Sequence, residues 1–460
     1  MITEINNSYN EYKYFISEYL LPLLGIPSEI EIEKYGKEKD DTALVLYQNK
    51  YLIFSSHNRN MYRVKVQHDI IDDSIKLVRN IITSFFTISK YRMDEESTTR
   101  INNHYSSNIQ LETVYRMAVQ KGICNWVVGT NSVAVERLFQ IIEKWSVQTY
   151  EGKKVTFGFV INPDKEVDED TQYGNWFDFL DDDFSAVFTD CVNSVIELDK
   201  NCNFYKYLSI TEDNHVEGYK LTHETSYRFS HIMQKYIFEN KVGVFLLNNG
   251  DIIISKRGAI KFVKRNLKWL NFSYDAFKNA FGDFLNEHNI EEQLLQQVFA
   301  SMLDVSFSHT GGIISVISNV NDIINKADKN EEILSISDYL LSNATDEEIA
   351  NELRNENNDK EINKRILKRR VLKAFIDDKS FTQLDRKLRC ELISLDGACI
   401  LDKIGNICSC GAIIKNDSGS SGGGRGAASK KLSAYGFSIK ISTDGYIELY
   451  IDRDLKYAIK

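Results

Sequence analysis

The chain has 460 residues, 43% of them hydrophobic and 27% charged, so its length allows two or three domains and its composition excludes a wholly disordered protein. A formal net charge of −10 provides no overall positive field and disfavours nucleic acid as a partner. The seven scattered cysteines fit reduced thiols, and the lack of a secretory-type start or a long apolar run predicts a cytoplasmic protein that does not enter membranes.

Residues 1–240 predict a mixed α+β region whose role the sequence does not identify. Two β-prone runs at 42–47 and 51–55 come before an expected helix over 71–90. The apolar run 155–161 predicts a buried strand, because it is rich in valine, isoleucine and phenylalanine. This part of the chain is therefore expected to combine helices with short strands.

Residues 241–294 predict a β-meander followed by a helical bridge to the last domain. Three β-prone runs are separated by glycine-containing pairs that suit tight hairpin turns. The runs are 242–247, 252–255 and 260–264, with Asn249-Gly250 and Arg257-Gly258 between them.

Residues 295–460 predict an α/β domain with a mixed sheet flanked by helices and interrupted by a helical insert at about 319–389. A glycine-led apolar strand is expected over 311–317, before the insert. Within the insert, Thr345 and Glu348 have the spacing of a capping box that opens a helix. The basic stretch 364–373 predicts a helix with one solvated basic face.

The first candidate for chemistry is the segment 392–401, in which a strand is expected to deliver Asp396 onto a Gly397-Ala398 turn. A carboxylate there can hold a divalent cation against a polyphosphate, and glycine leaves room for the ligand. Taken alone, an Asp-Gly pair is more often only a turn.

The second candidate is the glycine-rich segment 418–426. Its composition alone favours a flexible linker. Its flanks favour a different interpretation, because a strand is expected before it and a helix is expected to begin near Ala427. A glycine-rich loop that leads from a strand into a helix can bind phosphate with its backbone N–H groups, and Arg425, Lys430 and Lys431 would add positive charge.

The order of these motifs resembles the diadenylate cyclase domain, the nucleotide-binding module of the DNA-integrity scanning protein and its relatives. The resemblance covers about residues 295–460 and excludes the rest of the chain. It depends on the strand at 311–317, on Asp396-Gly397-Ala398, on the glycine-rich loop with Arg425, and on a hairpin closed by Ser442-Thr-Asp-Gly445.

This resemblance implies an α/β fold that binds ATP or a cyclic dinucleotide. In active members, two ATP molecules meet across a homodimer interface and condense to cyclic di-AMP with the help of magnesium or manganese. Asp396 would then be the catalytic and metal-binding carboxylate. The nucleotide-binding residues implied by the resemblance are Gly397, Ala398, Gly422, Gly423, Gly424, Arg425, Gly426 and Lys430.

The chain departs from the family in the phosphate-binding motif. Active members carry Gly-Thr-Arg-His-Arg-Ala-Ala, whereas this chain has Gly-Gly-Arg-Gly-Ala-Ala at 423–428, without the histidine and the second arginine. Loss of such donors slows phosphoryl chemistry more than it weakens ground-state binding. The sequence therefore favours a sensor in nucleotide second-messenger signalling over an active cyclase, and places a ligand-free interaction scaffold third.

Overall fold

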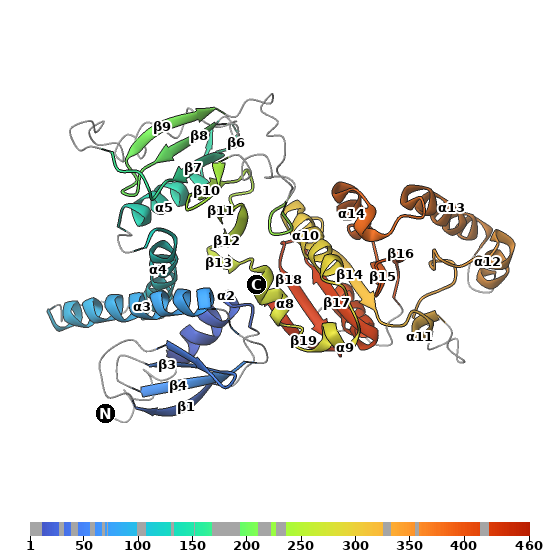
Figure 1. Cartoon of the computed structure of the whole chain (residues 1–460), viewed down its shortest axis with the longest axis horizontal. Helices are drawn as coiled ribbons and strands as arrows, with labels where there is room; N and C mark the ends of the chain where they lie inside the picture. The colour runs from blue at the N-terminus through green and yellow to red at the C-terminus, as the bar shows by residue number, and fades with distance from the viewer. Residues whose placement is uncertain are drawn as a thin grey trace. The chain divides into compact units, whose positions relative to one another are not determined.

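The computed structural model describes residues 12–26, 32–37, 45–55, 60–66, 70, 72–98, 107–129, 133–150, 152–167, 194–209, 222–226, 236–324, 333–354, 358–414 and 423–460. The chain divides into two units, Met1–Thr222 with Phe229–Asn279, and His223–Arg228 with Ala280–Lys460 (Figure 1). Both combine helices with sheets, so the expected α/β class is confirmed. Within these described ranges, no helix is both long enough and apolar enough to span a bilayer.

In the first unit, short helical segments pack on a four-stranded antiparallel sheet. The buried Tyr12 hydroxyl donates a hydrogen bond to the Ser55 carbonyl (2.8 Å) and joins the two parts. The expected strands are confirmed at 45–47 and 51–55 as a hairpin, and residues 42–44 lie outside the described residues. The elements are η1 (Ile16–Leu20), α2 (Leu21–Leu23), β1 (Ile32–Lys37), β2 (Val45–Gln48), β3 (Tyr51–Ser55) and β4 (Asn60–Lys65), in sheet order β1-β4-β3-β2.

A second, seven-stranded sheet completes this unit and shares one apolar core with the first sheet and the helices. These helices are α3 (Asp72–Thr98), α4 (Ser107–Val128) and α5 (Val133–Ser146), and α8 (Tyr274–Asn279) follows the last strand of the sheet. The sheet order is β13-β12-β11-β10-β7-β8-β9, and β5 (Thr149–Tyr150) pairs separately with β6 (Lys153–Lys154). The strands are β7 (Phe157–Ile161), β8 (Ser194–Leu198), β9 (Phe204–Ser209), β10 (Val242–Leu246), β11 (Ile252–Lys256), β12 (Ala259–Arg265) and β13 (Lys268–Asn271).

The predicted meander is confirmed as β10, β11 and β12, to which β13 adds a fourth antiparallel strand. Its first strand also pairs with β7, so the meander is part of the seven-stranded sheet. Residues 241–294, grouped as one segment in the sequence, thus divide between the two units. A short-range pattern predicts hairpins well, but it does not indicate which distant strand pairs with the free side of a meander.

The second unit is built on a six-stranded sheet in the order β16-β15-β14-β17-β18-β19. Its central strand β14 is buried along its whole length, which explains its unbroken apolar sequence. The β14–β15 pair is parallel, whereas every other pair in this sheet is antiparallel. The strands are β14 (Gly312–Ile317), β15 (Ala398–Asp402), β16 (Ile407–Ala412), β17 (Gly436–Ile441), β18 (Ile447–Ile451) and β19 (Asp454–Ile459).

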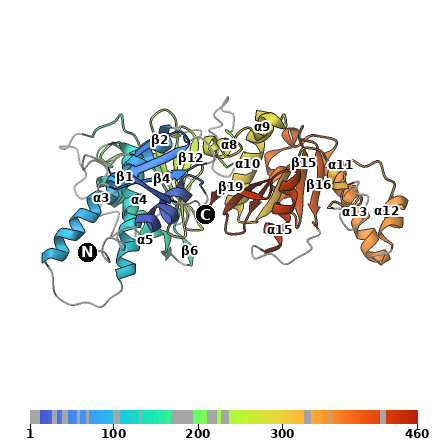
Figure 2. The ribbon, with the colours of Figure 1, turned by 90° about the horizontal axis from the view of Figure 1, so that it is seen from below.

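Helices cover both faces of this sheet (Figure 2). Ile313 and Ile317 of β14 pack with Ala428 and Leu432 of α15 (Gly423–Leu432) in one core. The helices α10 (Glu292–Ser308) and α14 (Arg386–Ile393) contact the sheet as well. The remaining helical elements are α9 (Phe284–Glu287), α11 (Asn321–Ile324), α12 (Asp346–Leu353), α13 (Asp359–Ile376), η5 (Phe381–Gln383) and η6 (Ser433–Tyr435).

The predicted helical insert is present between β14 and β15 as α11 to α14. The capping box is confirmed, because the Glu348 amide donates to the Thr345 hydroxyl while the Glu348 carboxylate accepts from the Thr345 amide. The basic stretch is confirmed as helix α13. Its Arg369 is an exception to the solvated face, since it is buried and donates to the Tyr339 and Ser342 carbonyls.

A buried ion pair joins α10 to α14. Arg386 donates from Nε to Oδ2 of Asp304 (2.5 Å) and from Nη2 to Oδ1 (3.2 Å), and the Asp304 side chain has no exposed surface. Nη2 also donates to the carbonyls of Thr225 and Ala300. The pair is therefore well satisfied, and removing one partner would leave a buried charge without compensation.

We predict that Asp304→Ala lowers the free energy of unfolding of this unit by about 3–5 kcal/mol, because the Arg386 guanidinium stays buried. Hydrogen–deuterium exchange of α10 and α14 peptides in urea measures the loss. Asp454→Ala is the matched control, since Asp454 is 72% exposed in its ion pair with Lys456 and should change stability by less than about 1 kcal/mol. Equal effects of the two substitutions would contradict the prediction.

Candidate functional site

The parallel pairing of β14 with β15 brings two chain segments together where these strands begin. Ile313 is paired with Ala398, so the residues just before each strand also lie side by side. The Thr310 and Ser394 hydroxyls are hydrogen-bonded across the two segments (2.7 Å). We call residues 309–312 and 394–398 the β14/β15 start.

Asp396 lies in the turn between α14 and β15 and its side chain is exposed. The expected strand before Asp396 is wrong, because Leu392 and Ile393 form the last turn of α14. Asp385 caps that helix by accepting hydrogen bonds from the Lys387 and Leu388 amides. The apolar pair Leu392-Ile393 suits a buried helix face as well as a strand, and only the cap upstream distinguishes the two.

Gly397 is required by a close approach of two backbones. Its φ is +114°, and a Cβ there would lie 2.5 Å from the Gly411 carbonyl carbon and 2.6 Å from the Ala412 carbonyl oxygen. Gly411 on β16 also has a positive φ, at the irregular register between the two strands. The Ala398 side chain is fully buried in the core. Packing therefore explains why glycine and alanine occupy positions 397 and 398, independently of any ligand.

The glycine-rich segment enters α15 earlier than expected. The helix begins at Gly423, so Gly424, Arg425 and Gly426 belong to its first turn, whereas the sequence predicted a start near Ala427. Gly422 and residues 415–421 lie outside the described residues. Glycine disfavours helix by about 1 kcal/mol per residue, and for this reason the sequence placed the start of the helix too late. Packing of α15 on β14 and β17 overrides that preference.

Arg425 places its guanidinium at the β14/β15 start. Its Nη1 lies 3.1 Å from the position that a Cβ on Gly311 would occupy, and the Thr443 amide nitrogen is equally close to that position. Gly311 has a φ of +69°, so a side chain there would meet both backbone strain and the arginine. The His309 ring contacts the Thr443 carbonyl through Nδ1 (3.1 Å). The β17–β18 turn thus forms part of the same site.

The structure brings Asp396, Gly397 and Arg425 to one end of one sheet. Among the described residues, neither the Asp396 carboxylate nor the Arg425 guanidinium makes a hydrogen bond or an ion pair. A carboxylate and a guanidinium without such partners are available for a ligand. The positive end of the α15 dipole lies at the same place, because Arg425 is in its first turn.

Divalent metal at Asp396 would need ligand oxygens in addition to the protein. Within the part of the chain that the structure describes, no group of three or more histidine, cysteine, aspartate or glutamate residues is arranged to hold a metal. Magnesium is commonly bound by one or two carboxylates together with substrate phosphates. The residues present therefore fit a metal that arrives with a nucleotide, rather than one held by the protein alone.

Lys430 lies farther along α15, with its ammonium 5.7 Å from the centre of the Tyr450 ring. Below the first turn of the same helix, a Cβ on Gly426 would be 4.0 Å from the Lys440 Nζ. Lys440 and Glu448 are cross-strand partners in β17 and β18 and form an ion pair (2.8 Å). This ion pair therefore lies beneath the first turn of the helix.

Glu448 is held by three donors. Burial would by itself raise the pKa of the Glu448 carboxyl, but hydrogen bonds from Lys440 (2.8 Å), Lys460 (2.6 Å) and the Tyr450 hydroxyl (2.8 Å) outweigh it and lower the pKa to about 2. A folded-state pKa below the unfolded one means that ionised Glu448 stabilises the fold. That contribution is full above the ordinary value of 4.5 and is lost as pH falls through this range towards about 2.

We predict that Glu448→Gln lowers the free energy of unfolding by about 1–2 kcal/mol at about pH 7, less than for a fully buried pair because Lys460 is half exposed. The difference from wild type should narrow as pH falls towards about 3, since the wild-type contribution itself is being lost. Urea unfolding followed by circular dichroism measures both values. Asp454→Asn serves as the control, and a difference that grows on acidification would contradict the prediction.

Some residues of this site were missed in the sequence. Thr310 and Ser394 do not belong to a recognisable motif. They are 84 positions apart in the sequence, and their contact depends on the pairing of β14 with β15. The Lys440–Glu448 pair could be predicted from the sequence, because the turn at 442–445 places these residues opposite each other in a hairpin. Gly311 was seen only as the start of a strand, and its contact with Arg425 depends on the position of α15.

Comparisons with protein-family models, with curated proteins and with solved structures find no match for this chain.

Proposed function

We propose that the second unit binds an adenine nucleotide or a cyclic dinucleotide at the β14/β15 start and acts as a sensor in nucleotide second-messenger signalling. The observation that carries this proposal is the meeting of Arg425 with Gly311, beside the turn that holds Asp396. A guanidinium forms paired hydrogen bonds with phosphate oxygens. A nearby carboxylate accepts hydrogen bonds from ribose hydroxyls or holds a phosphate-bound metal ion.

The helix end supports the same class of ligand. The first N–H groups of a helix have no partners inside the helix and carry partial positive charge, so they favour phosphate. In α15, the glycines at 423 and 424 meet no neighbouring atom where a Cβ would lie, which leaves this turn accessible among the described residues. The resemblance to the diadenylate cyclase domain supports an adenine nucleotide in particular, together with its dinucleotide product.

Binding is favoured over synthesis for a specific reason. Phosphoryl transfer requires strong charge neutralisation at the α-phosphate. The first turn of α15 contributes one guanidinium, and Lys440, which lies beneath that turn, is paired with Glu448. The alternative function is an active cyclase that condenses two ATP with magnesium or manganese in a homodimer. Such a cyclase would have less positive charge at the α-phosphate.

We predict that Arg425→Ala weakens binding of cyclic di-AMP or ATP by about 10- to 100-fold, because a charge-assisted hydrogen bond to phosphate is lost. Isothermal titration calorimetry with each nucleotide measures the change. The matched control is Arg453→Ala, an exposed arginine with positive φ in the β18–β19 turn, at the other end of the strands. Equal weakening by both substitutions, or no binding of either nucleotide to wild type, would refute the proposed site.

Product analysis separates the sensor from the cyclase. Purified protein is incubated with ATP and magnesium or manganese, and cyclic products are detected by chromatography. We predict that no cyclic di-AMP forms. A product that disappears in Asp396→Asn, but persists in Asp454→Asn, would replace the sensor by the cyclase.

A further inference from the structure

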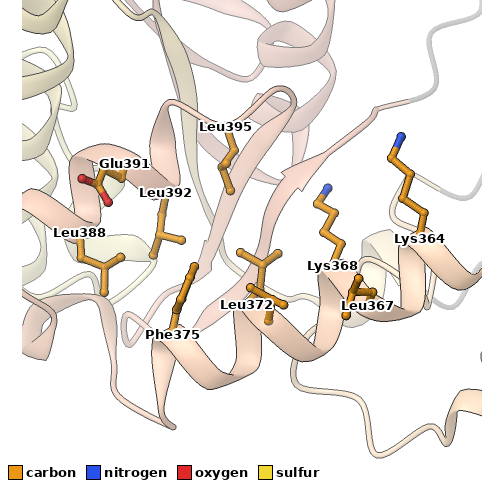
Figure 3. Close-up of a pocket in the computed structure, with 10 residues that line it drawn as sticks. Lys364, Leu367, Lys368, Leu372, Phe375, Leu388, Glu391, Leu392 and Leu395 are labelled. Atoms are coloured by element: carbon orange, nitrogen blue, oxygen red, sulfur yellow. The ribbon is translucent and has the colours of Figure 1, made fainter.

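An apolar groove of about 530 Å³ lies between α13 and α14 (Figure 3). Leu367, Leu372 and Phe375 of α13 form one wall, and Leu388 and Leu392 of α14 form the other. Leu395, in the turn that follows α14, lines it as well. All of these residues belong to the second unit.

The α13 wall exposes large apolar side chains in one stripe. Leu367, Val371 and Phe375 are spaced four residues apart, so they lie on the same side of the helix. Their exposed fractions are 61%, 41% and 59%. Single exposed apolar residues are common on protein surfaces, but a continuous stripe beside a groove is typical of a binding surface.

The charge around the groove is opposite to that of the chain. Helix α13 carries seven lysines and arginines against two acidic residues, whereas the whole protein has a net charge of −10. Lys364 and Lys368 line the groove, and Glu391 is its one acidic lining residue in the described structure. A partner that fills the groove therefore gains from negative charge beside its apolar surface.

We propose that this groove binds an amphipathic helix of another protein that carries acidic residues beside an apolar stripe. The walls are two helices, so the surface offers side chains and no strand edge for an extended peptide. From Leu367 to Phe375 the helix rises about 12 Å, which matches the apolar face of a partner helix of two to three turns. Lys364, which is 76% exposed, favours acidic over basic partners.

The groove is connected to the nucleotide site by Lys368. Its ammonium donates to the Gly411 carbonyl (2.6 Å) and would be 3.0 Å from a Cβ on Gly411, while the Asp396 carbonyl lies 3.1 Å from the same position. Leu395 lines the groove and directly precedes Asp396. A ligand that shifts the Asp396 turn thus changes the groove, and this coupling rests on the function proposed above.

The test is binding of a labelled helical peptide of about 16 residues to the full chain, measured by fluorescence anisotropy. The peptide has leucines on one face and glutamates beside them, and a second peptide has lysines in place of the glutamates. The glutamate peptide should bind more tightly. Phe375→Ser should weaken it by about tenfold or more, and Ile404→Ser should not, although Ile404 is equally exposed in the same unit.

Three results would overturn the docking proposal: equal binding of the two peptides, equal effects of Phe375→Ser and Ile404→Ser, or a wild-type dimer that Phe375→Ser converts to monomer, which would assign the groove to a second copy.

The coupling between the nucleotide and the groove is measured separately. Saturating cyclic di-AMP should change peptide affinity in wild type but not in Asp396→Asn. An unchanged affinity in a chain that binds the nucleotide would contradict the coupling, whereas a chain that binds no nucleotide would contradict the proposed function instead.

Discussion

The parallel pairing of β14 with β15 is the constraint on which the candidate site depends. In a sheet that is otherwise antiparallel, this pair makes two strands begin at the same end. The Asp396 turn consequently lies beside Gly311, although 84 residues separate the neighbouring Thr310 and Ser394. An antiparallel pair would place these segments at opposite ends of the sheet.

Two close approaches maintain this arrangement. Gly397 brings the start of β15 against the end of β16, and Gly312 lies against the Ile393 carbonyl at the end of α14, 2.4 Å from where its Cβ would be. Glycine is needed at both positions, because any side chain would meet backbone atoms. The Asp304–Arg386 pair then fixes α14 against α10. The position of the Asp396 turn is thus set by packing around it.

Features that depend on local interactions could be predicted from the sequence, whereas those that depend on long-range pairing could not. Capping at Thr345 and the β10–β12 hairpins are local, and both were predicted. The pairing of β10 with β7 is long-range and was not predicted. The helical state of Leu392 and of Gly423 was also missed, because strand-like and linker-like compositions are overridden there by a cap at Asp385 and by packing of α15. For the candidate site, Asp396 and Arg425 were singled out from the sequence, whereas the polar contacts at the β14/β15 start depend on the tertiary fold.

A sensor has to connect a ligand site to a surface that another molecule reads. In the proposed sensor, these two places are Arg425 with the start of α15, and Lys368 with the apolar groove, and the Asp396 turn lies between them. Leu395, which lines the groove, and Asp396 are consecutive, so one turn belongs to both places. In the proposed sensor, this turn links the helical insert between β14 and β15 to the ligand site.

The most direct test of ligand binding at the β14/β15 start is hydrogen–deuterium exchange of the full chain with and without saturating cyclic di-AMP or ATP. We predict protection of peptides that cover residues 309–312, 394–398 and 423–428. Protection confined to other parts of the chain, or no protection with either nucleotide, would contradict the proposed site.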